Sequence, residues 1–391
     1  MTSSGTSNRA SGVAAQVALG WSLYMTLMGS YWTAGGAGYP LGHHDVRGPD
    51  SGSLLTTMDA AVGGPAIAAT GVVGLALVLL LSRGRPRTAS RRTAMILAGG
   101  SFAVLLVIVA VDGRAITLLP PLGLVPIKWV EADWPTVFQM TIPAAAAAYF
   151  LATVALARRT ADRSPAGLAR SAVRSRGWDR VGRVATYVAI LCPLPYAIVR
   201  LCWSRGWAVG APEPYVESLL RVQPANVWIE PILAGFALTG VFLTTGLLSR
   251  WGRVFPSWIP ALGGRRVPLW LPLGLGGSAV IGIGTFGKGM LLGRLGVEQP
   301  GALSELQQWG MSVQGWEYWG VDGLGWILFP LWSVSLAVAL AGYCHRPGPL
   351  LPAEPHAGRV RPSGPALTAR AGRLPARPPA SGRPGARSRA G

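Results

Sequence analysis

Three charged residues that could do chemistry stand among apolar residues. Arg200 lies in the run YAIVRLCW, Glu230 directly precedes a second apolar run, and Lys288 lies near the end of a third. A charge at the centre of a membrane span costs at least about 2.5 kcal/mol, so it snorkels, pairs or lines a cavity. We expect Arg200 to pair with Glu230, with Glu217 as the other possible partner, or to anchor a ligand. The same interpretations apply to Lys288, and the three residues form a candidate outward-facing polar site.

A second candidate site is aromatic. Trp316, Glu317 and Trp319, with Tyr318 between them, could stack a sugar ring or a lipid head group and hydrogen-bond its hydroxyls. Tryptophan also anchors membrane helices at the membrane–water interface. The sequence leaves both interpretations open. It fixes no catalytic pair, because the spacing of the other acidic residues says nothing of their geometry.

A third group of residues resembles a metal site in composition only. His43, His44 and Asp45 combine imidazole and carboxylate ligands, which suit zinc and other transition ions. Their spacing matches no standard metal signature, and we predict a polar surface loop without metal. The three cysteines form no metal motif or disulfide framework and are expected to pack as small apolar residues.

Familiar cofactor and catalytic motifs do not occur in the sequence. It contains no GxxxxGK[ST], HExxH or GxSxG pattern. The glycine-rich run 282–289 lacks phosphate-loop spacing and indicates close helix packing. Haem A synthases also have eight spans in two halves, but here no histidine falls within an expected span. We therefore predict no cofactor.

The elements that must position these residues are membrane helices. Of the 391 residues, 50% are hydrophobic and only 13% charged, against about 25% charged in soluble domains. A span needs about 20 mostly apolar residues. Eight stretches meet this condition and predict an all-α integral membrane protein: 13–32, 61–81, 93–111, 137–157, 185–203, 231–248, 267–286 and 324–343.

The charges of the connecting segments predict the orientation of these spans. Arginine is concentrated in 83–92, 158–183, 250–266 and the tail after 343. With Arg9, this face carries 27 basic and 3 acidic residues, and the other face carries 8 basic and 13 acidic residues. Cytoplasmic loops carry the excess of Lys and Arg. Both termini should therefore be cytoplasmic in a plasma-membrane protein, with the candidate sites outside.

The two halves of the chain resemble each other. We predict two tandem four-helix repeats, 13–157 and 185–343, between a cytoplasmic N-terminus (1–12), a basic linker (158–184) and a disordered Arg/Pro-rich tail (344–391). Repeats with an even number of spans share one orientation, and a ligand site would lie between them. The matching positions are Tyr24 with Tyr196, Trp32 with Trp203, Pro65 with Pro231, Arg83 with Arg250, GGS at 99–101 with GGS at 276–278, and Pro143 with Pro330.

The net charge of +19 does not indicate a nucleic-acid partner, because the arginines lie beside spans and in the tail. Anionic lipid at the cytoplasmic face is the expected counter-charge. The linker could form an amphipathic helix on that leaflet or a solvated loop. The sequence does not fix an oligomeric state.

Two segments carry a family resemblance, around Tyr24, Trp32 and Gly35–Gly36, and around Arg253 and Pro256. They resemble uncharacterised multi-span membrane proteins of high-GC actinobacteria. This resemblance implies membrane insertion and no particular activity.

Three functions are compatible with this architecture. A transporter or binding component would hold a small molecule or lipid between the halves. An enzyme acting on a lipid-linked substrate would show convergent carboxylates or histidines in an outer pocket. A structural subunit of a membrane complex would show a packed bundle with a docking patch.

Overall fold

The computed structural model describes residues 3–48, 53–118, 133–162, 164–222, 224–260, 262–295 and 316–345. Within these ranges the chain is mainly helical, and its β pairing is limited to one isolated antiparallel bridge between Val254 and Arg266. The tail 344–391, apart from Cys344 and His345, lies outside the described residues, as do Trp129, Glu131 and the segment 296–315.

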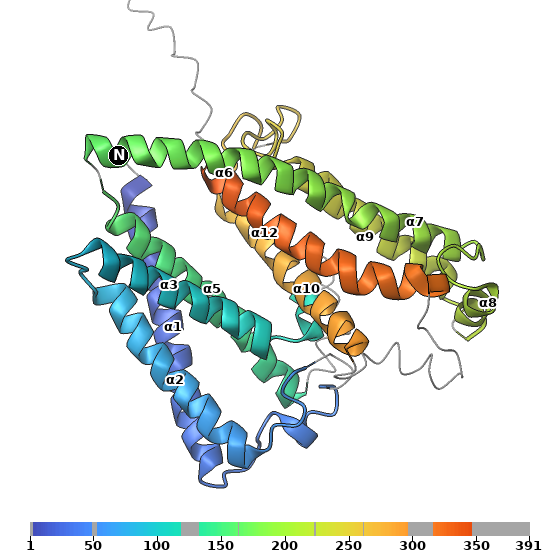
Figure 1. The fold of residues 1–391 in the computed structure, drawn as a ribbon, viewed down its shortest axis with the longest axis horizontal. Helices are drawn as coiled ribbons and strands as arrows, with labels where there is room; N and C mark the ends of the chain where they lie inside the picture. Colours follow the sequence, from blue (N-terminus) through green and yellow to red (C-terminus); the bar gives the residue numbers. More distant parts are fainter. Residues whose placement is uncertain are drawn as a thin grey trace, which may run out of the picture. The chain divides into compact units, whose positions relative to one another are not determined.

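The first half is a group of four helices, α1, α2, α3 and α5, which Figure 1 shows together. The helix α1 packs against α2 and α5, and α3 packs against α5. The third helix ends in a π-helical turn, η2, before a short 3-10 segment, η3. The bounds are α1 (Ser3–Thr33), α2 (Ala60–Arg83), α3 (Ala89–Leu105), η2 (Leu106–Ala110), η3 (Gly113–Leu118) and α5 (Trp134–Arg159), with a 3-10 turn η1 (Gly42–His44) after α1.

The second half repeats these pairings. Its first helix, formed by α6 and α7, packs against α9 and α12, and α10 packs against α12. The bounds are α6 (Pro165–Leu191), α7 (Pro193–Trp203), α8 (Glu213–Val222), α9 (Asn226–Thr245), α10 (Trp270–Arg294), η5 (Trp316–Tyr318), the π-helical η6 (Trp319–Leu328) and α12 (Phe329–His345).

Among the described residues, seven helices are long and apolar enough to cross a membrane. The chain is therefore a multi-pass membrane protein by the length and composition of its helices. The first expected span is not among the seven, although α1 is 31 residues long, because polar residues such as Gln16, Ser22 and Thr26 dilute its hydropathy. The seven segments are Ala60–Arg83, Ala89–Ala110, Trp134–Arg159, Pro165–Trp203, Asn226–Thr245, Trp270–Leu292 and Gly323–His345.

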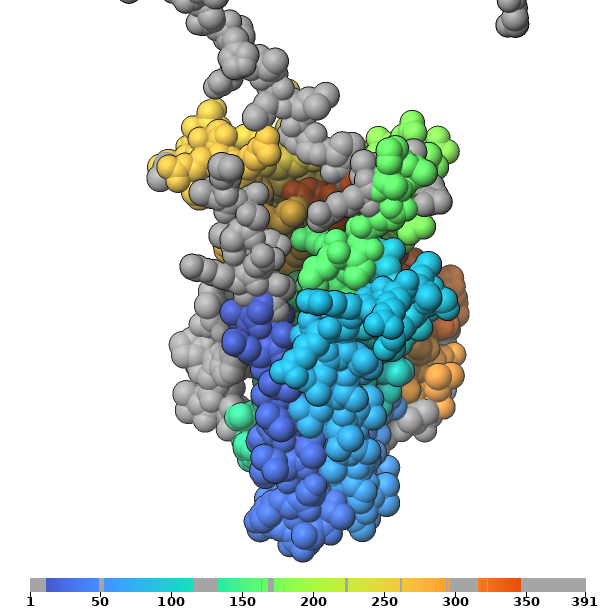
Figure 2. Space-filling model, turned by 90° about the vertical axis from the view of Figure 1, so that its left-hand side faces the viewer, coloured from blue at the N-terminus to red at the C-terminus, as the bar shows by residue number. Residues whose placement is uncertain are grey.

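Small residues let α1 and α2 approach closely, and the two helices lie side by side on one face of the first half (Figure 2). A Cβ atom at Gly29 would clash with the backbone of Ala68, and one at Gly71 would clash with Thr26. Close approach at small residues is how membrane helices gain contact where lipid supplies no hydrophobic driving force.

The basic segment after the first half is neither a separate surface helix nor a solvated loop. Ser164 caps the helix α6 by accepting a hydrogen bond from the Gly167 amide at 3.0 Å, and Pro165 occupies its first turn. The helix then continues through Leu191 into α7, so Pro165–Trp203 is one segment of 39 residues. At 1.5 Å per residue this segment is about 58 Å long, nearly twice the ~30 Å hydrocarbon core.

Candidate functional site

A buried charge cluster joins two loops at one end of the first half. The Arg114 guanidinium binds Asp45 with two hydrogen bonds, from Nη2 to Oδ2 at 2.6 Å and from Nη1 to Oδ1 at 2.9 Å. Its Nη2 also donates to Asp112 Oδ2 at 2.6 Å, and its Nε donates to both Asp112 oxygens at 3.1 Å. The exposed fractions of the side chains are 9% for Arg114, 2% for Asp45 and 1% for Asp112.

Local backbone breaks bring these three residues together. Asp45 follows the 3-10 turn η1, and Asp112 and Arg114 flank the start of η3. Burial by itself lowers the pKa of Arg114, but its hydrogen bonds to Asp112 and Asp45 outweigh this effect and raise the pKa. Arg114 is therefore a permanent cation held by two carboxylates.

Lys288 reaches this cluster from the second half. Its Nζ donates to the carbonyl oxygens of Val111 at 2.5 Å and Ile108 at 3.1 Å. Those carbonyls belong to the π-helical end of α3, where regular helical hydrogen bonds stop. The helix α10 also packs along η3. Lys288 thus places an ammonium group at the contact between the halves, next to Asp112.

Polar groups continue from the cluster into the first half. Arg114 Nη1 donates to Thr136 Oγ1 at 3.3 Å, and Gln139 lies one turn further along α5. Gln139 is 1% exposed, and among the described residues both polar atoms of its side chain are without a hydrogen-bond partner, as is the indole nitrogen of Trp32. Buried polar groups are normally paired. These atoms could therefore hydrogen-bond a small polar molecule.

Asp133 begins α5 beside the cluster. Its carboxylate accepts a hydrogen bond from the Thr136 amide at 3.0 Å. Burial raises the pKa of Asp133, but the hydrogen bonds from Thr136, together with the charges of Arg47 and Arg114, lower it below the usual range. An ionised carboxylate at this position stabilises the helix N-terminus.

The expected ion pair of Arg200 and Glu230 is present in the second half. Arg200 Nη1 lies 2.9 Å from both carboxylate oxygens of Glu230, which is 2% exposed. The guanidinium also lies over the rings of Tyr196 at 4.9 Å and Trp203 at 5.2 Å. The alternative partner, Glu217, is exposed on α8. Arg200 is thus enclosed by one carboxylate and two aromatic rings.

The aromatic candidate site is divided between surface and core. Trp316 is 86% exposed and Glu317 is exposed, whereas Tyr318 is buried with its ring centroid 6.1 Å from that of Tyr215. Trp319 is half-buried and packs against the same core. Trp316 and Glu317 are therefore exposed to solvent, Trp319 is exposed in part, and Tyr318 belongs to the core.

The histidine-rich loop separates its three candidate ligands. His43 Nδ1 lies 3.5 Å from Asp59, with both side chains more than 70% exposed. The rings of His43 and His44 pack on each other, whereas Asp45 is bound to Arg114. In the part of the chain that the structure describes, no group of three or more His, Cys, Asp or Glu side chains is placed to hold a metal ion.

His345 corrects one detail of the sequence analysis. It is the last residue of α12 and falls within the apolar segment Gly323–His345, whereas we expected every histidine to lie outside the spans. Its ring stacks on Trp178 with centroids 5.6 Å apart. The three cysteines are free thiols.

Sequence reasoning missed Asp112, Arg114 and Gln139. Asp112 and Arg114 directly follow an apolar stretch, whereas Arg200 and Lys288 lie within apolar stretches. A pair of opposite charges at the end of a span was the feature of the sequence that could have indicated Asp112 and Arg114. Nothing in the sequence joins that pair to Asp45, because their contact depends on how two loops fold over the same helix ends.

Comparison of the chain with protein-family models, with curated proteins and with solved structures finds no match. The function is therefore inferred from the geometry of the site. The site consists of two carboxylates and a guanidinium that bind one another, and of an ammonium group from the other half that bonds to the backbone carbonyl directly before Asp112.

Proposed function

We propose that the chain binds, and through alternating access transports, a small molecule or lipid at the contact between its two halves. The observation that carries this proposal is Lys288, a charged residue of one half bonded to Ile108 and Val111 of the other. Ionisable residues within membrane segments are costly and mark ligand or ion pathways. Parallel-repeat transporters bind substrate at the interface of their halves.

The charges of the site can exchange partners. Asp45, Asp112, Arg114 and Lys288 carry two negative and two positive charges, so the cluster is neutral as it stands. A ligand with an anionic group could replace Asp112 beside Arg114 only if the Asp112 carboxylate turned out to solvent, because a displaced carboxylate left buried would be unpaired, which is the costly outcome. We therefore propose that the cluster closes the outer end of the interface and opens for such a ligand.

The same geometry favours binding over catalysis on a lipid-linked substrate. Asp45 and Asp112 converge, as an enzyme would require, but both are buried and bound to Arg114. A general acid or base must come within hydrogen-bond reach of the substrate. The enzyme remains the alternative for a state in which Arg114 withdraws.

We further propose eight spans in the plasma membrane with both termini cytoplasmic, as the charge distribution predicts. The helix α1 supports this number, because 31 residues extend about 46 Å at 1.5 Å per residue and exceed the hydrocarbon core. The helix α1 also packs on α2 and α5, the second and fourth helices of its half. In the second half, α6 and α7 pack in the same way on α9 and α12. Two of the polar residues that lower the hydropathy of α1 meet other helices, Ser22 at Tyr149 of α5 and Thr26 at Gly71 of α2, whereas Gln16 is exposed.

Tandem duplication is part of the proposal. Pro65 follows the start of α2 at the same interval as Pro231 follows the start of α9. The first glycine of each GGS motif contacts the fourth helix of its half, Gly99 at Thr153 and Gly276 at Leu340. These matching roles support two halves of common design.

A purification experiment tests the binding proposal. The wild-type protein and Lys288→Met are extracted in mild detergent, and co-purifying small molecules and lipids are identified by mass spectrometry. We expect a species retained by the wild type to fall at least about tenfold in Lys288→Met, because one desolvated charge contact is worth 1.5–3 kcal/mol. Arg205→Met, which removes an exposed arginine at the end of α7, should retain it.

Thermal unfolding of both variants separates loss of a ligand from loss of the fold. If no species is enriched with the wild type, or if Lys288→Met retains it fully while folded, the interface is not a ligand site. A structural subunit would then be the better assignment.

A further inference from the structure

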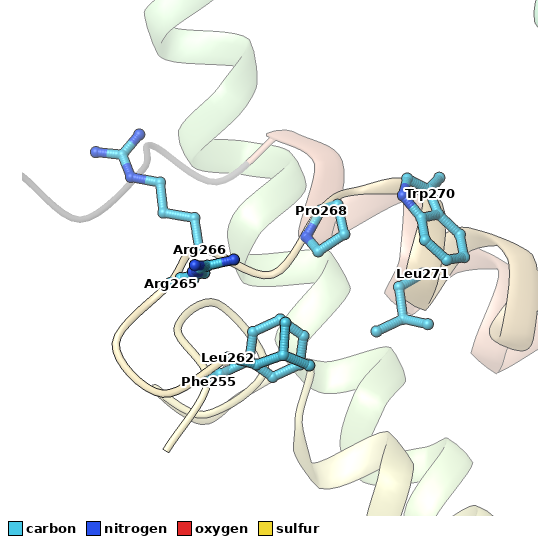
Figure 3. Close-up of a pocket in the computed structure, with 7 residues that line it drawn as sticks. All are labelled: Phe255, Leu262, Arg265, Arg266, Pro268, Trp270 and Leu271. Carbon is cyan, nitrogen blue, oxygen red and sulfur yellow. The ribbon is translucent and has the colours of Figure 1, made fainter. Parts of the chain in front are cut away.

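A pocket of about 440 Å³ lies at the other end of α10, away from Lys288. It is formed by the loop that joins α9 to α10 and by the first residues of α10. Figure 3 shows Phe255 and Leu262 on one side and Trp270 and Leu271 on the other, with arginines at the edge. The lining residues are Phe255, Leu262, Arg265, Arg266, Pro268, Trp270 and Leu271.

The loop holds this pocket open through its own backbone. The Phe255 amide donates to the Arg265 carbonyl at 2.9 Å, and the Val267 amide donates to the Arg253 carbonyl at 2.8 Å. Gly264 turns the chain with a φ of +74°, a conformation that favours glycine. The basic segment between α9 and α10 therefore forms a short hairpin-like structure.

Two contacts fix the loop to the helices. Tyr343 Oη donates to the Gly252 carbonyl at 2.7 Å, which ties the loop to α12. The ring of Trp251 stacks on Phe242 of α9 with centroids 5.1 Å apart. The loop that forms the pocket is therefore fixed to α9 and α12.

The pocket combines apolar walls with basic residues at its edge, as a binding site for an amphiphilic molecule does. Its walls are aromatic and aliphatic carbon, and the segment 250–271 contains four arginines and no acidic residue. Trp258 in the loop is 79% exposed, and Trp270 at the start of the apolar helix α10 is 71% exposed. Exposed tryptophan next to an apolar helix is typical of the membrane–water interface. Arg265 and Arg266 are exposed and offer forked donors to phosphate.

We infer that this pocket binds an anionic phospholipid of the leaflet that meets the start of α10, the cytoplasmic leaflet in the proposed topology. The upper part of an acyl chain lies between Leu262 and Trp270, and the phosphate lies against Arg265 and Arg266. Charge complementarity selects the anionic lipid, and the apolar walls exclude a soluble phosphate compound. This site is separate from the proposed ligand site at Lys288.

Native mass spectrometry of the full chain tests the assignment. The protein in detergent is titrated with dioleoyl phosphatidylglycerol or dioleoyl phosphatidylcholine. We expect the wild type to bind the first at least about tenfold more tightly, and Arg265→Gln/Arg266→Gln to lose that preference, because each basic residue near an anionic surface contributes favourably. Arg85→Gln/Arg87→Gln removes the same amount of charge from two exposed arginines of the other half. This variant should keep the preference for phosphatidylglycerol.

Two further arms separate the lipid from its head group. Leu262→Glu, at a position that is 42% exposed, should weaken phosphatidylglycerol binding without lowering the melting temperature. Glycerol phosphate at millimolar concentration should not displace the lipid. Equal loss in both arginine pairs, unchanged binding in Arg265→Gln/Arg266→Gln, or displacement by glycerol phosphate would overturn the assignment.

Discussion

Arg200 shows how one intramembrane charge is held by several groups at once. Its guanidinium meets both oxygens of Glu230 and the faces of Tyr196 and Trp203. Paired charge and cation–π contact together offset the cost of removing it from water. The sequence predicts this pair, because two opposite charges stand at the same expected depth in adjacent spans.

The energy of this pair can be measured in a double-mutant cycle. Arg200→Ala should lower the free energy of unfolding in detergent by about 3 kcal/mol, because it leaves Glu230 buried and uncompensated. Glu230→Gln should couple to it by about 1–3 kcal/mol. Arg205→Ala, at an exposed position, is the control and should change stability by less than about 0.5 kcal/mol. Additive effects of the two substitutions would show that the pair contributes no interaction energy.

The cluster of Asp45, Asp112 and Arg114 could not be predicted in the same way. Asp45 suggested a metal ligand because it follows two histidines, but the backbone turns after η1 and directs it to Arg114. Side chains on loops meet through loop geometry, which hydropathy does not encode. The pair that lies on helices was predictable, and the cluster that lies on loops was not.

At the scale of helices, the sequence predicts which segments are apolar better than it predicts where each helix ends. The helix α5 begins at Trp134, three residues before the expected span, because Asp133 caps it. The helix α6 begins twenty residues before its span, because Ser164 and Pro165 start it and no further proline follows until Pro193. Capping residues set these boundaries, whereas the spans were drawn from hydropathy alone.

Glycines at helix contacts provide a test at this scale. A Cβ atom at Gly276 would lie 2.8 Å from Leu340, and one at Gly99 would meet Thr153, so alanine at either position should destabilise the protein by about 1–3 kcal/mol. At the adjacent Gly100 and Gly277 no described residue lies within 4 Å of the same atom, and alanine there should be neutral or slightly stabilising. Unfolding in detergent measures all four variants.

The stabilities of these glycine variants test the proposed duplication as well as the helix packing. If Gly99→Ala and Gly276→Ala are both tolerated, close approach of the third and fourth helices is not needed. If only one half is sensitive, the two GGS motifs do not have equivalent roles.

At the scale of the whole molecule, charge distribution and helix pairing point to the same organisation. Each half pairs its first helix with its second and fourth, and its third with its fourth. The basic segments fall at one set of helix ends, and the clusters around Arg114 and Arg200 fall at the other set. Seven segments meet the criteria for spans, and α1 decides between seven crossings and eight.

Cysteine labelling decides this point most directly. In a variant with Cys192, Cys202 and Cys344 replaced by serine, single cysteines are placed at Ser4 before the expected first span and at Val46 after it. Val46 is 81% exposed. With α1 crossing the membrane, an impermeant maleimide added to intact cells should label Val46→Cys and not Ser4→Cys, and both should react after permeabilisation. Labelling of both positions, or of Ser4→Cys alone, in intact cells would contradict eight spans with cytoplasmic termini.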